Sequence, residues 1–319
     1  MDIKNIANLI GNTPMIKIKI KIDDKIKNIF AKLEYYNYTG SIKDRIAYNI
    51  LLDAYDKKLI DCNTPIIEAT SGNTGISFSA LGALLGNPVH IFMPDWVSVE
   101  RIKIMQMYGA NIHMVTKKDG GFRGAIKMAD DLAIRINGFR PNQFSNNINT
   151  LTHYNTTALE ILKKAPNIDA FVCGFGTGGT LIGISKRLKD YNPQIKTIAL
   201  EPSNMTLLSK NKVIGKHKIE GIGDDFLPDI IDTNFIDNNV TINDFDAINM
   251  ARRLSRELGL GVGISSGANM LASAISPYEN IVTIFADDMK KYLSTELTKE
   301  KEDGIYLSDK IEFLSIENL

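Results

Sequence analysis

Cysteine and histidine are scarce in this sequence. Among its 319 residues there are two cysteines, Cys62 and Cys173, and four histidines scattered along the chain. Two cysteines cannot form a disulfide framework, and no histidine lies at a spacing typical of metal ligands. We therefore expect both cysteines to be buried free thiols, no metal ion to be bound, and the protein to work in the reducing cytoplasm.

An excess of charge of either sign is also absent. The 37 lysines and arginines balance the 37 aspartates and glutamates. A chain without net charge offers no electrostatic attraction for nucleic acid or an anionic membrane, which argues against both as partners. No apolar run reaches the roughly 18 residues of a membrane span, and the first residues lack the pattern of a signal peptide. The sequence therefore predicts a soluble protein.

The chain does contain a regular alternation of strand and helix patterns. Short apolar runs bounded by turn residues predict strands, and the segments of helical period between them predict helices. The strands are expected at residues 66–69, 89–93, 112–115, 168–172, 197–200 and 281–285, and the helices at 76–85, 99–108 and 180–188. This alternation predicts an α/β fold with parallel sheets. Two glycine-rich strand-to-helix turns suggest two α/β lobes that face one cleft.

The second of these turns, Gly174-Phe175-Gly176-Thr177-Gly178-Gly179-Thr180, has the spacing G-x-G-x-x-G between a strand and a helix. Glu201 follows about 20 residues later, where dinucleotide-binding folds place an acid on a ribose hydroxyl. A nicotinamide or flavin site is therefore one hypothesis. A phosphate of another ligand is a second, because backbone N–H groups at a helix start attract any phosphate. A tight turn that only packs the helix on the sheet is a third.

The first glycine-rich turn, residues 70–75, is dense in polar groups. Thr70, Ser71, Asn73 and Thr74 lie within five residues at the start of a predicted helix. Hydroxyl and N–H donors in such a turn can bind a carboxylate. A simple helix cap is the alternative, although one polar residue would be enough for that.

A lysine, Lys43, occupies the start of a further helical segment, after Gly40-Ser41-Ile42. A positive charge there opposes the helix dipole, so the amine loses its proton more easily. Such an amine suits Schiff-base chemistry. An ordinary solvated lysine is the alternative.

Taken together and in this order, these motifs resemble the cysteine synthase and cystathionine β-synthase family of fold type II pyridoxal-phosphate enzymes. The resemblance covers nearly the whole chain and rests on six segments, residues 40–45, 70–75, 142–144, 176–180, 221–223 and 263–268. It favours a pyridoxal-phosphate site over a dinucleotide site.

The resemblance implies roles for single residues. Lys43 would form the Schiff base with pyridoxal 5′-phosphate and then take the Cα proton of the substrate. Asn73 would hydrogen-bond the O3′ oxygen of the cofactor, and Ser265 would meet its pyridine nitrogen. The cofactor phosphate would be held by Gly176, Thr177, Gly178, Gly179 and Thr180, and the substrate by Thr70, Ser71, Gly72, Thr74, Gln143 and Gly221.

The resemblance also implies an architecture of two α/β lobes with open twisted sheets. Residues 41–147 would form a smaller mobile lobe that binds substrate, and residues 1–40 and 148–319 a larger lobe that binds the cofactor. The turn at residues 137–142 is the expected crossover between them. A homodimer is expected.

The implied reaction is β-replacement on a β-substituted L-alanine through an α-aminoacrylate intermediate. Asp224, after Gly221-Ile222-Gly223, departs from the family pattern, and so does the segment 287–290. We hypothesise that Asp224 is catalytic: it would hydrogen-bond a thiol leaving group and then orient or deprotonate water or a thiol. L-cysteine would be the donor, with hydrogen sulfide and either L-serine or lanthionine as products.

Other interpretations stay open at this point. Asp224 can be an exposed loop acid, and the protein an O-acetylserine sulfhydrylase that makes L-cysteine from sulfide, with a serine acetyltransferase tail as partner. A catalytically silent binding paralogue and an oxidoreductase are more remote alternatives.

Overall fold

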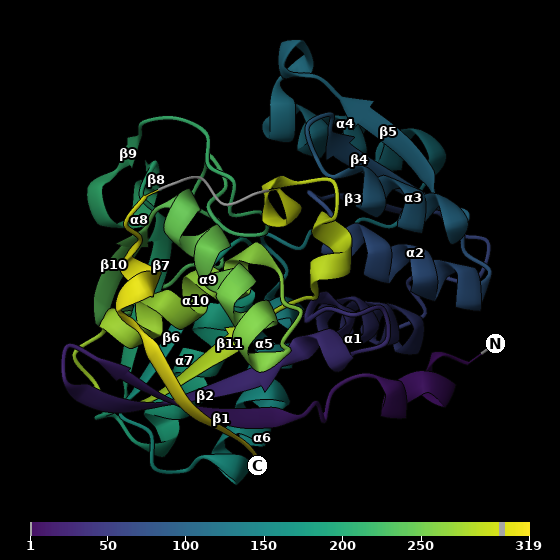
Figure 1. Cartoon of the computed structure of the whole chain (residues 1–319). Coiled ribbons are helices and arrows are strands. Elements are labelled where there is room, and N and C mark those ends of the chain that lie inside the picture. The colour runs from purple at the N-terminus through teal and green to yellow at the C-terminus, as the bar shows by residue number, and fades with distance from the viewer. Residues whose placement is uncertain (1, 300–303) are drawn as a thin grey trace.

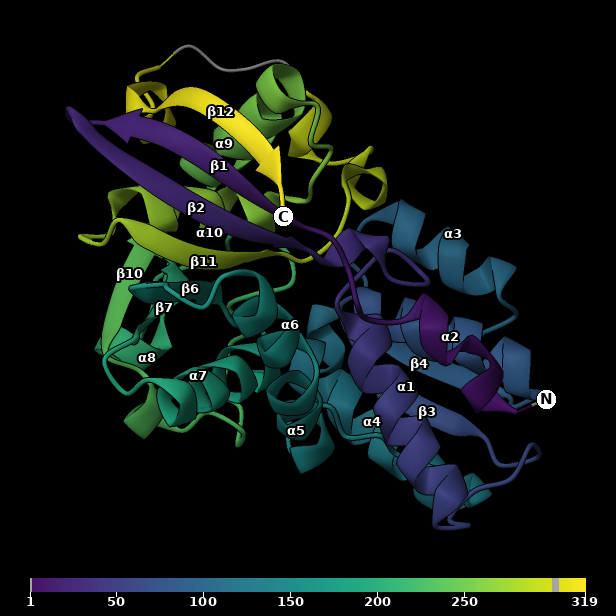
Figure 2. The same cartoon turned by 90° about the horizontal axis from the view of Figure 1, so that it is seen from below.

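The chain folds around two separate β-sheets. The computed structural model describes residues 2–299 and 304–319. We call the part built on a seven-stranded sheet the large lobe and the part built on a three-stranded sheet the small lobe; they lie side by side in Figures 1 and 2. In sheet order the large-lobe strands are β10 (Asn238–Ile242), β7 (Lys196–Pro202), β6 (Ala170–Gly174), β11 (Asn280–Phe285), β2 (Lys25–Leu33), β1 (Met15–Ile22) and β12 (Glu312–Asn318).

Burial explains the order of these strands. The five strands from β10 to β2 are parallel, and β11, the central strand of the seven, is apolar and buried along nearly its whole length. The outer strands β1 and β12 run antiparallel to their neighbours. Strand β1 alternates isoleucine and lysine, with buried isoleucines and more exposed lysines. This alternation fits a strand with one solvated face near the edge of a sheet.

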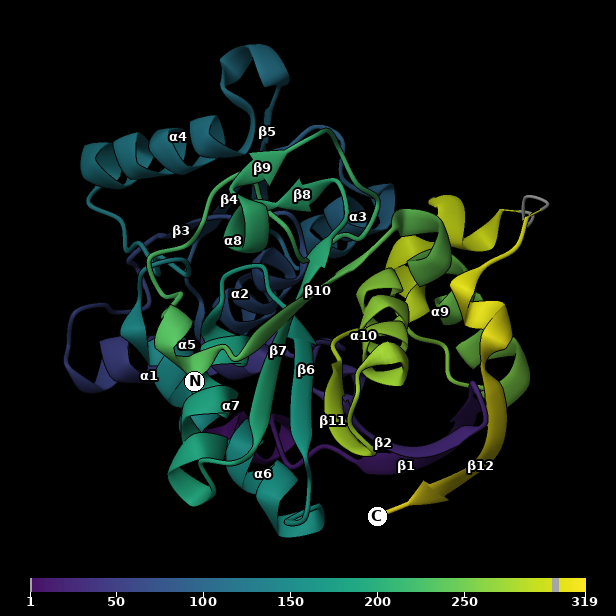
Figure 3. The same cartoon turned by 90° about the vertical axis from the view of Figure 1, so that its left-hand side faces the viewer.

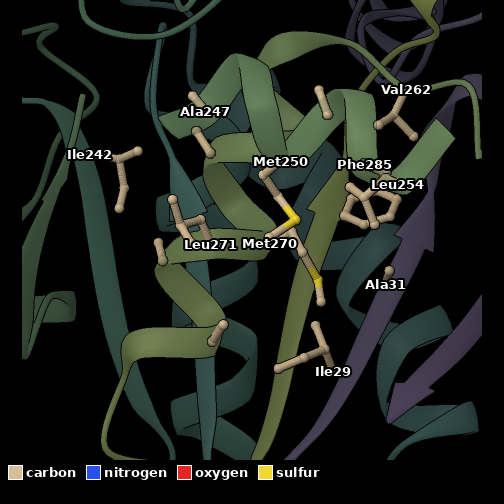
Figure 4. Packing of buried hydrophobic residues seen from close by; sticks show 14 of the residues in the cluster. Ile29, Ala31, Ile242, Ala247, Met250, Leu254, Val262, Met270, Leu271 and Phe285 are labelled. Atoms are coloured by element: carbon tan, nitrogen blue, oxygen red, sulfur yellow. The ribbon is translucent and has the colours of Figure 1, made fainter. Parts of the chain in front are cut away.

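Helices cover both faces of the large sheet (Figure 3). One face carries α6 (Thr157–Lys164) and α7 (Gly179–Tyr191), with α5 (Asn147–Asn155) packed on both of them. The other face carries α10 (Ile264–Ile275), itself covered by α9 (Asp244–Leu258). Met250 of α9 and Met270 of α10 fill the space above Ile29 of β2 (Figure 4). Helix α10 is buried on all sides, so its position beside the sheet is fixed by packing.

The small lobe contains alternating helices and parallel strands. They are α1 (Lys43–Asp56), β3 (Ile66–Ala69), α2 (Asn73–Leu85), β4 (Val89–Pro94), α3 (Val99–Met107), β5 (Asn111–Val115) and α4 (Gly121–Ile136). Shorter elements are α8 (Leu207–Lys210), the β8 (Met205–Thr206) and β9 (Lys212–Val213) pair, and the 3-10 helices η1 (Ile3–Leu9), η2 (Glu34–Tyr36), η3 (Lys117–Asp119), η4 (Thr233–Phe235), η5 (Met289–Tyr292), η6 (Glu296–Thr298) and η7 (Leu307–Lys310).

The sequence-based expectations for this fold are largely confirmed. Each predicted strand and helix is present, within a few residues at its ends. Helix α2 begins at Asn73, three residues earlier than expected, so the polar turn is already part of the helix. Strand β12, which follows β11 in the chain, was not predicted.

The thiol prediction is half wrong. Cys173 is buried, whereas Cys62 is exposed, because it lies in the solvated loop between α1 and β3. Among the described residues, no helix is long and apolar enough to cross a membrane. In the same part of the chain, no three metal-ligating side chains cluster.

Candidate active site

A pocket with about 530 Å³ of empty volume lies between the two lobes. It is bounded by the N-terminal ends of α1, α2, α7 and α10 and by the loop before Ile222. Parallel α/β sheets bind ligands in this position, at the carboxyl ends of their strands. The residues predicted for the site that line it are Lys43, Asn73, Gly176, Thr177, Gly178, Thr180, Gly221 and Ser265.

Lys43 is the first residue of α1, as expected, and its side chain borders the pocket. Burial lowers the pKa of its amine, while the carboxylate of Asp287 acts in the opposite direction, with smaller contributions from Cys173 and Asp224. A lysine with a lowered pKa has a larger neutral fraction at neutral pH. It is therefore suited to act as a nucleophile and as a base.

The helix that carries Lys43 is anchored by buried ion pairs. Arg45 donates to Glu34 through Nε at 2.6 Å and through NH2 at 2.9 Å. Its NH1 and NH2 groups each donate to Glu160 of α6 at 2.7 Å. These bonds lower the pKa of the Glu34 carboxyl strongly, in spite of its burial. Because the network joins α1 to the large lobe, it fixes the position of Lys43.

The segment from Gly176 to Thr180 forms a cradle at the start of α7. Gly178 has a φ of 89°, and a Cβ there would lie 2.6 Å from Ile231 Cδ1, so only glycine fits. The Asn149 side-chain amide donates to Thr177 Oγ1 at 2.9 Å and to the Gln143 carbonyl at 2.8 Å. Backbone N–H groups and two hydroxyls at a helix start fit a phosphate.

Gly179, the remaining predicted residue of this cradle, lies behind it. A Cβ at Gly179 would overlap the Asn149 side chain. Thr180 Oγ1 contacts His153 Nε2 at 3.2 Å. Burial lowers the pKa of His153 to about 3, so the ring stays neutral. Asn149 and His153 were not predicted, because no motif connects them to their partners. Thr177 lies 28 positions after Asn149, and Thr180 lies 27 positions after His153.

The polar turn at residues 70–75 reaches the pocket through Asn73. The predicted substrate-binding residues that do not line this pocket are Thr70, Ser71, Gly72, Thr74 and Gln143. Thr70 Oγ1 accepts a hydrogen bond from the Gly72 N–H at 3.0 Å. Thr74 Oγ1 donates to Gln143 Oε1 at 2.6 Å, and Gln143 Nε2 donates to the Ala69 carbonyl at 2.9 Å. The structure thus brings Gln143 to the turn as predicted. Ser71 and Asn73 are half-buried, and the rest of the turn is buried.

Asp224 lies beside the pocket on the loop that follows Gly223. Its Oδ2 atom is 3.9 Å from the position of a Cβ built on Gly176. Burial, and to a smaller extent the charge of Asp225, raises the pKa of its carboxyl to about 6, and the nearby Lys43 ammonium opposes this shift. No described residue donates a hydrogen bond to this carboxylate. Asp224 is therefore free to exchange protons near neutral pH.

Two contacts hold this loop against the small lobe. Phe226 packs on Phe122 and Phe144, with ring centroids 6.2 and 5.0 Å away. Arg123 NH2 donates to the Asp225 carbonyl at 3.2 Å. The position of Asp224 is consequently linked to the position of the small lobe.

Glu201 does not have the role that the dinucleotide hypothesis requires. Its side chain is buried, and its two oxygens accept the N–H groups of Leu208 at 2.7 Å and Ser209 at 3.0 Å. The carboxylate caps the short helix α8 and is not available to a ribose. This geometry contradicts the dinucleotide hypothesis.

Comparisons with known proteins identify the family to which a chain with this site belongs. The chain matches the family described as pyridoxal-phosphate dependent enzyme over residues 6–287. It is 42% identical over 300 residues to cysteine synthase B of Campylobacter jejuni, which covers 92% of this chain and 98% of that protein. Cysteine synthase of Staphylococcus aureus is 37% identical over 302 residues, covering 92% and 97%. The crystal structure of a hydrogen sulfide-producing enzyme from Fusobacterium nucleatum has a TM-score of 0.94 at 45% identity, covering 99% of this chain and 98% of that one.

The residues of the pocket fit this cofactor. Lys43 supplies an amine of lowered pKa, and the cradle at Gly176 supplies donors for a phosphate. Ser265 supplies a hydroxyl at the start of α10, and Asn73 supplies a side-chain amide at the start of α2. The chain belongs to the family of fold type II pyridoxal-phosphate dependent enzymes that includes the cysteine synthases.

Proposed function

We propose that this enzyme consumes L-cysteine and water and releases L-serine and hydrogen sulfide, with lanthionine as the product when a second L-cysteine replaces water. The single observation that carries the proposal is the Asp224 carboxylate. It lies against the phosphate cradle, has a pKa of about 6, and accepts no hydrogen bond from any described residue.

Each group has one task in this reaction. Bound pyridoxal phosphate supplies an electron sink that makes the Cα proton acidic and lets the β substituent leave. Lys43 Nζ takes the proton from Cα and later returns it. The turn at residues 70–74, with Gln143, binds the substrate carboxylate through N–H and O–H donors.

Asp224 moves a second proton, which passes from water to the sulfur leaving group. In its ionised form it accepts a hydrogen bond from the neutral thiol of L-cysteine, which leaves as a hydrogensulfide ion when the Cβ–S bond breaks. Asp224 then takes a proton from water while the hydroxide oxygen bonds to Cβ. That proton passes to hydrogensulfide, so the products are L-serine and hydrogen sulfide. A base with a pKa near 6 is suited to this exchange at neutral pH.

The charge of Asp224 also favours this direction over synthesis of cysteine. An ionised carboxylate beside the reacting carbon repels an incoming hydrogensulfide ion, and it does not repel water or a neutral thiol. The likeness to the hydrogen sulfide-producing enzyme of Fusobacterium nucleatum supports the same direction.

Cysteine synthase activity is the second candidate. It is favoured by the identity of 42% to cysteine synthase B of Campylobacter jejuni. In that case the donor is O-acetyl-L-serine, sulfide is the nucleophile, and a serine acetyltransferase tail is a possible partner.

Lobe movement and assembly belong to the proposal as well. We propose that residues 41–147 close on the substrate by turning about the start of α1, which Arg45 holds on the large lobe, and that the loop of Asp224 moves with Phe122 and Arg123, which it already contacts. The enzyme is proposed to act as a homodimer in the cytoplasm, which light scattering of the purified holoenzyme would test.

The deciding experiment compares two reactions in the wild type and in two variants. Sulfide release from L-cysteine is measured beside cysteine formation from O-acetyl-L-serine and sulfide. Asp224→Asn is expected to reduce sulfide release by about 100-fold, the usual contribution of a general base. The matched control Asp225→Asn removes the same charge one residue later and is expected to stay within about threefold of the wild type at pH 8.

Two results would contradict the proposal. Full sulfide release by Asp224→Asn would show that Asp224 is a loop acid. Faster formation of cysteine from O-acetyl-L-serine than release of sulfide from L-cysteine, in the wild type, would establish a cysteine synthase instead.

A further inference from the structure

A second buried carboxylate, Asp287, lies beside the pocket at the end of β11. Its Oδ2 atom accepts hydrogen bonds from Asn73 Nδ2 at 2.7 Å and from the Tyr292 hydroxyl at 2.8 Å. Arg101 NH2 lies 4.0 Å from the same oxygen. The other oxygen, Oδ1, is buried and has no hydrogen-bond partner among the described residues. Asp287 therefore contacts groups from both lobes.

The backbone of Asp287 is held where two functional segments meet. Residues 286 and 287 pair with the segment before Lys43, through the Ser41 to Asp287 bridge and the Ile42 N–H bond to the Ala286 carbonyl at 2.9 Å. On the other side, the N–H of Gly263 donates to the Asp287 carbonyl at 3.0 Å. A Cβ at Gly263 would overlap the Asp287 carboxylate. Glycine at this position thus makes room for the acid.

Several charged groups surround this carboxylate. Its charge acts against the lowering of the pKa of Lys43 and Lys291 by burial. The pKa of the Tyr292 hydroxyl is raised well above its usual value by burial and by Asp287. Tyr292 therefore stays protonated, and its hydroxyl donates to Asp287.

The hydrogen-bonding chemistry of a carboxylate restricts the side chain of Asn73. A carboxylate accepts hydrogen bonds and donates none, whereas an amide has a donor end and an acceptor end. Asn73 must therefore turn its nitrogen toward Asp287. The flipped amide would place its oxygen against the Asp287 oxygen, with two acceptors in contact. The second hydrogen of the same Asn73 nitrogen makes no hydrogen bond to a described residue, and Asn73 lines the pocket.

We propose that Asp287 is a positioning residue that fixes the amide of Asn73 with its nitrogen, and hence an N–H donor, directed to the pyridoxal-phosphate ring. Asp287 itself does not line the pocket and acts through Asn73. The proposal rests on the cofactor-binding role of Asn73. It is independent of Asp224 and of the choice between L-cysteine and O-acetyl-L-serine.

The test is a double-mutant cycle on cofactor affinity, measured by titrating pyridoxal phosphate into the apoenzymes without any substrate. Asp287→Asn keeps the size of the side chain but offers Asn73 both a donor and an acceptor, so both amide orientations become possible. We expect its Kd for pyridoxal phosphate to rise about tenfold, the difference between a charge-assisted and a neutral hydrogen bond. The absorbance spectrum of the bound cofactor and its pH dependence should change as well.

The cycle is completed with Asn73→Ala. If Asp287 acts through Asn73, adding Asp287→Asn to Asn73→Ala changes the Kd by less than about twofold. Asp288→Asn is the matched control, because Asp288 pairs with the exposed Lys290 at 3.8 Å. Its Kd should stay within about twofold of the wild type.

Two outcomes would overturn the proposal. One is a Kd of Asp287→Asn within about twofold of the wild type. The other is a double variant whose Kd rises by the product of the two single-variant increases. Thermal unfolding of each apoenzyme shows whether it is folded. Should Asp287→Asn not fold, Asp287→Ser replaces it in the same cycle, with the same expected loss and the same contradicting results. These results do not depend on whether L-cysteine is the substrate, so failure of the proposed function is separately recognisable.

Discussion

Replacing Asp224 by asparagine should stabilise the protein at neutral pH while it removes the proposed catalytic base. The fold raises the pKa of this carboxyl from 3.8 to about 6. A shift of this size corresponds to about 3 kcal/mol of preference for the neutral form. Because the side chain is partly exposed, solvent screening reduces the effect on stability to about 1–2 kcal/mol.

The sign of this effect depends on pH. The pKa of the folded state lies above that of the unfolded state, so the unfolded chain loses this proton first as the pH rises. The contribution of Asp224 to stability is therefore highest below pH 3.8 and falls until the pH passes about 6. Asparagine resembles the neutral acid, so the variant should equal the wild type near pH 4 and exceed it at pH 7.5. The melting temperature should then be higher by about 2–4 °C.

The pH dependence of activity should depend on the same Asp224 carboxyl, but with the opposite sign. Activity requires the ionised form, whereas the neutral form favours stability. In the wild type, kcat/KM for L-cysteine should fall about tenfold for each pH unit below 6, because the ionised acid is the active form. Asp225→Asn should move this acid limb to lower pH, since the charge of Asp225 helps to raise the pKa of Asp224. The measurements are calorimetry of the apoenzymes and initial rates of sulfide release. A stability difference of equal size at pH 4 and pH 7.5 would refute the reasoning.

Three further predictions concern the anchoring network, the cradle and the thiols. Arg45→Met leaves Glu34 as a buried charge, so urea unfolding should show a loss of about 3–5 kcal/mol at pH 7; because the fold lowers the pKa of Glu34 from 4.5, this loss should shrink as the pH falls below that value. Gly179→Ala would push Asn149 away from Thr177, so the Kd for pyridoxal phosphate should rise about tenfold or more in a titration. A thiol reagent should modify Cys62 in the native protein, but it should reach Cys173, whose pKa burial raises to about 12, only after denaturation.

Much of the site was predictable from the sequence, because its motifs are local. The glycine-rich turn before α7, the polar turn before α2 and the lysine at the start of α1 each specify a backbone conformation within a few residues. The structure places Lys43, Asn73, Gly176 and Ser265 around one pocket, as expected from the motifs and their order.

The supporting contacts could not be predicted in this way. Asn73 and Asp287 are 214 positions apart in the sequence, Thr74 and Gln143 are 69 apart, and Asn149 and Thr177 are 28 apart. His153 has no motif around it and still touches Thr180.

The sequence by itself therefore determined the α/β class, the family and several of the residues that line the pocket. Tertiary structure alone decided which buried partners fix those groups, that Glu201 caps a helix, and that Cys62 is exposed while Cys173 is buried. The physical reason is the separation along the chain between the residues that interact. A turn or a helix start is set by dihedral preferences and hydrogen bonds between neighbours in the chain. The orientation of an amide or the pKa of a carboxyl, in contrast, depends on charges and on burial by segments that only the packing of the two lobes brings together.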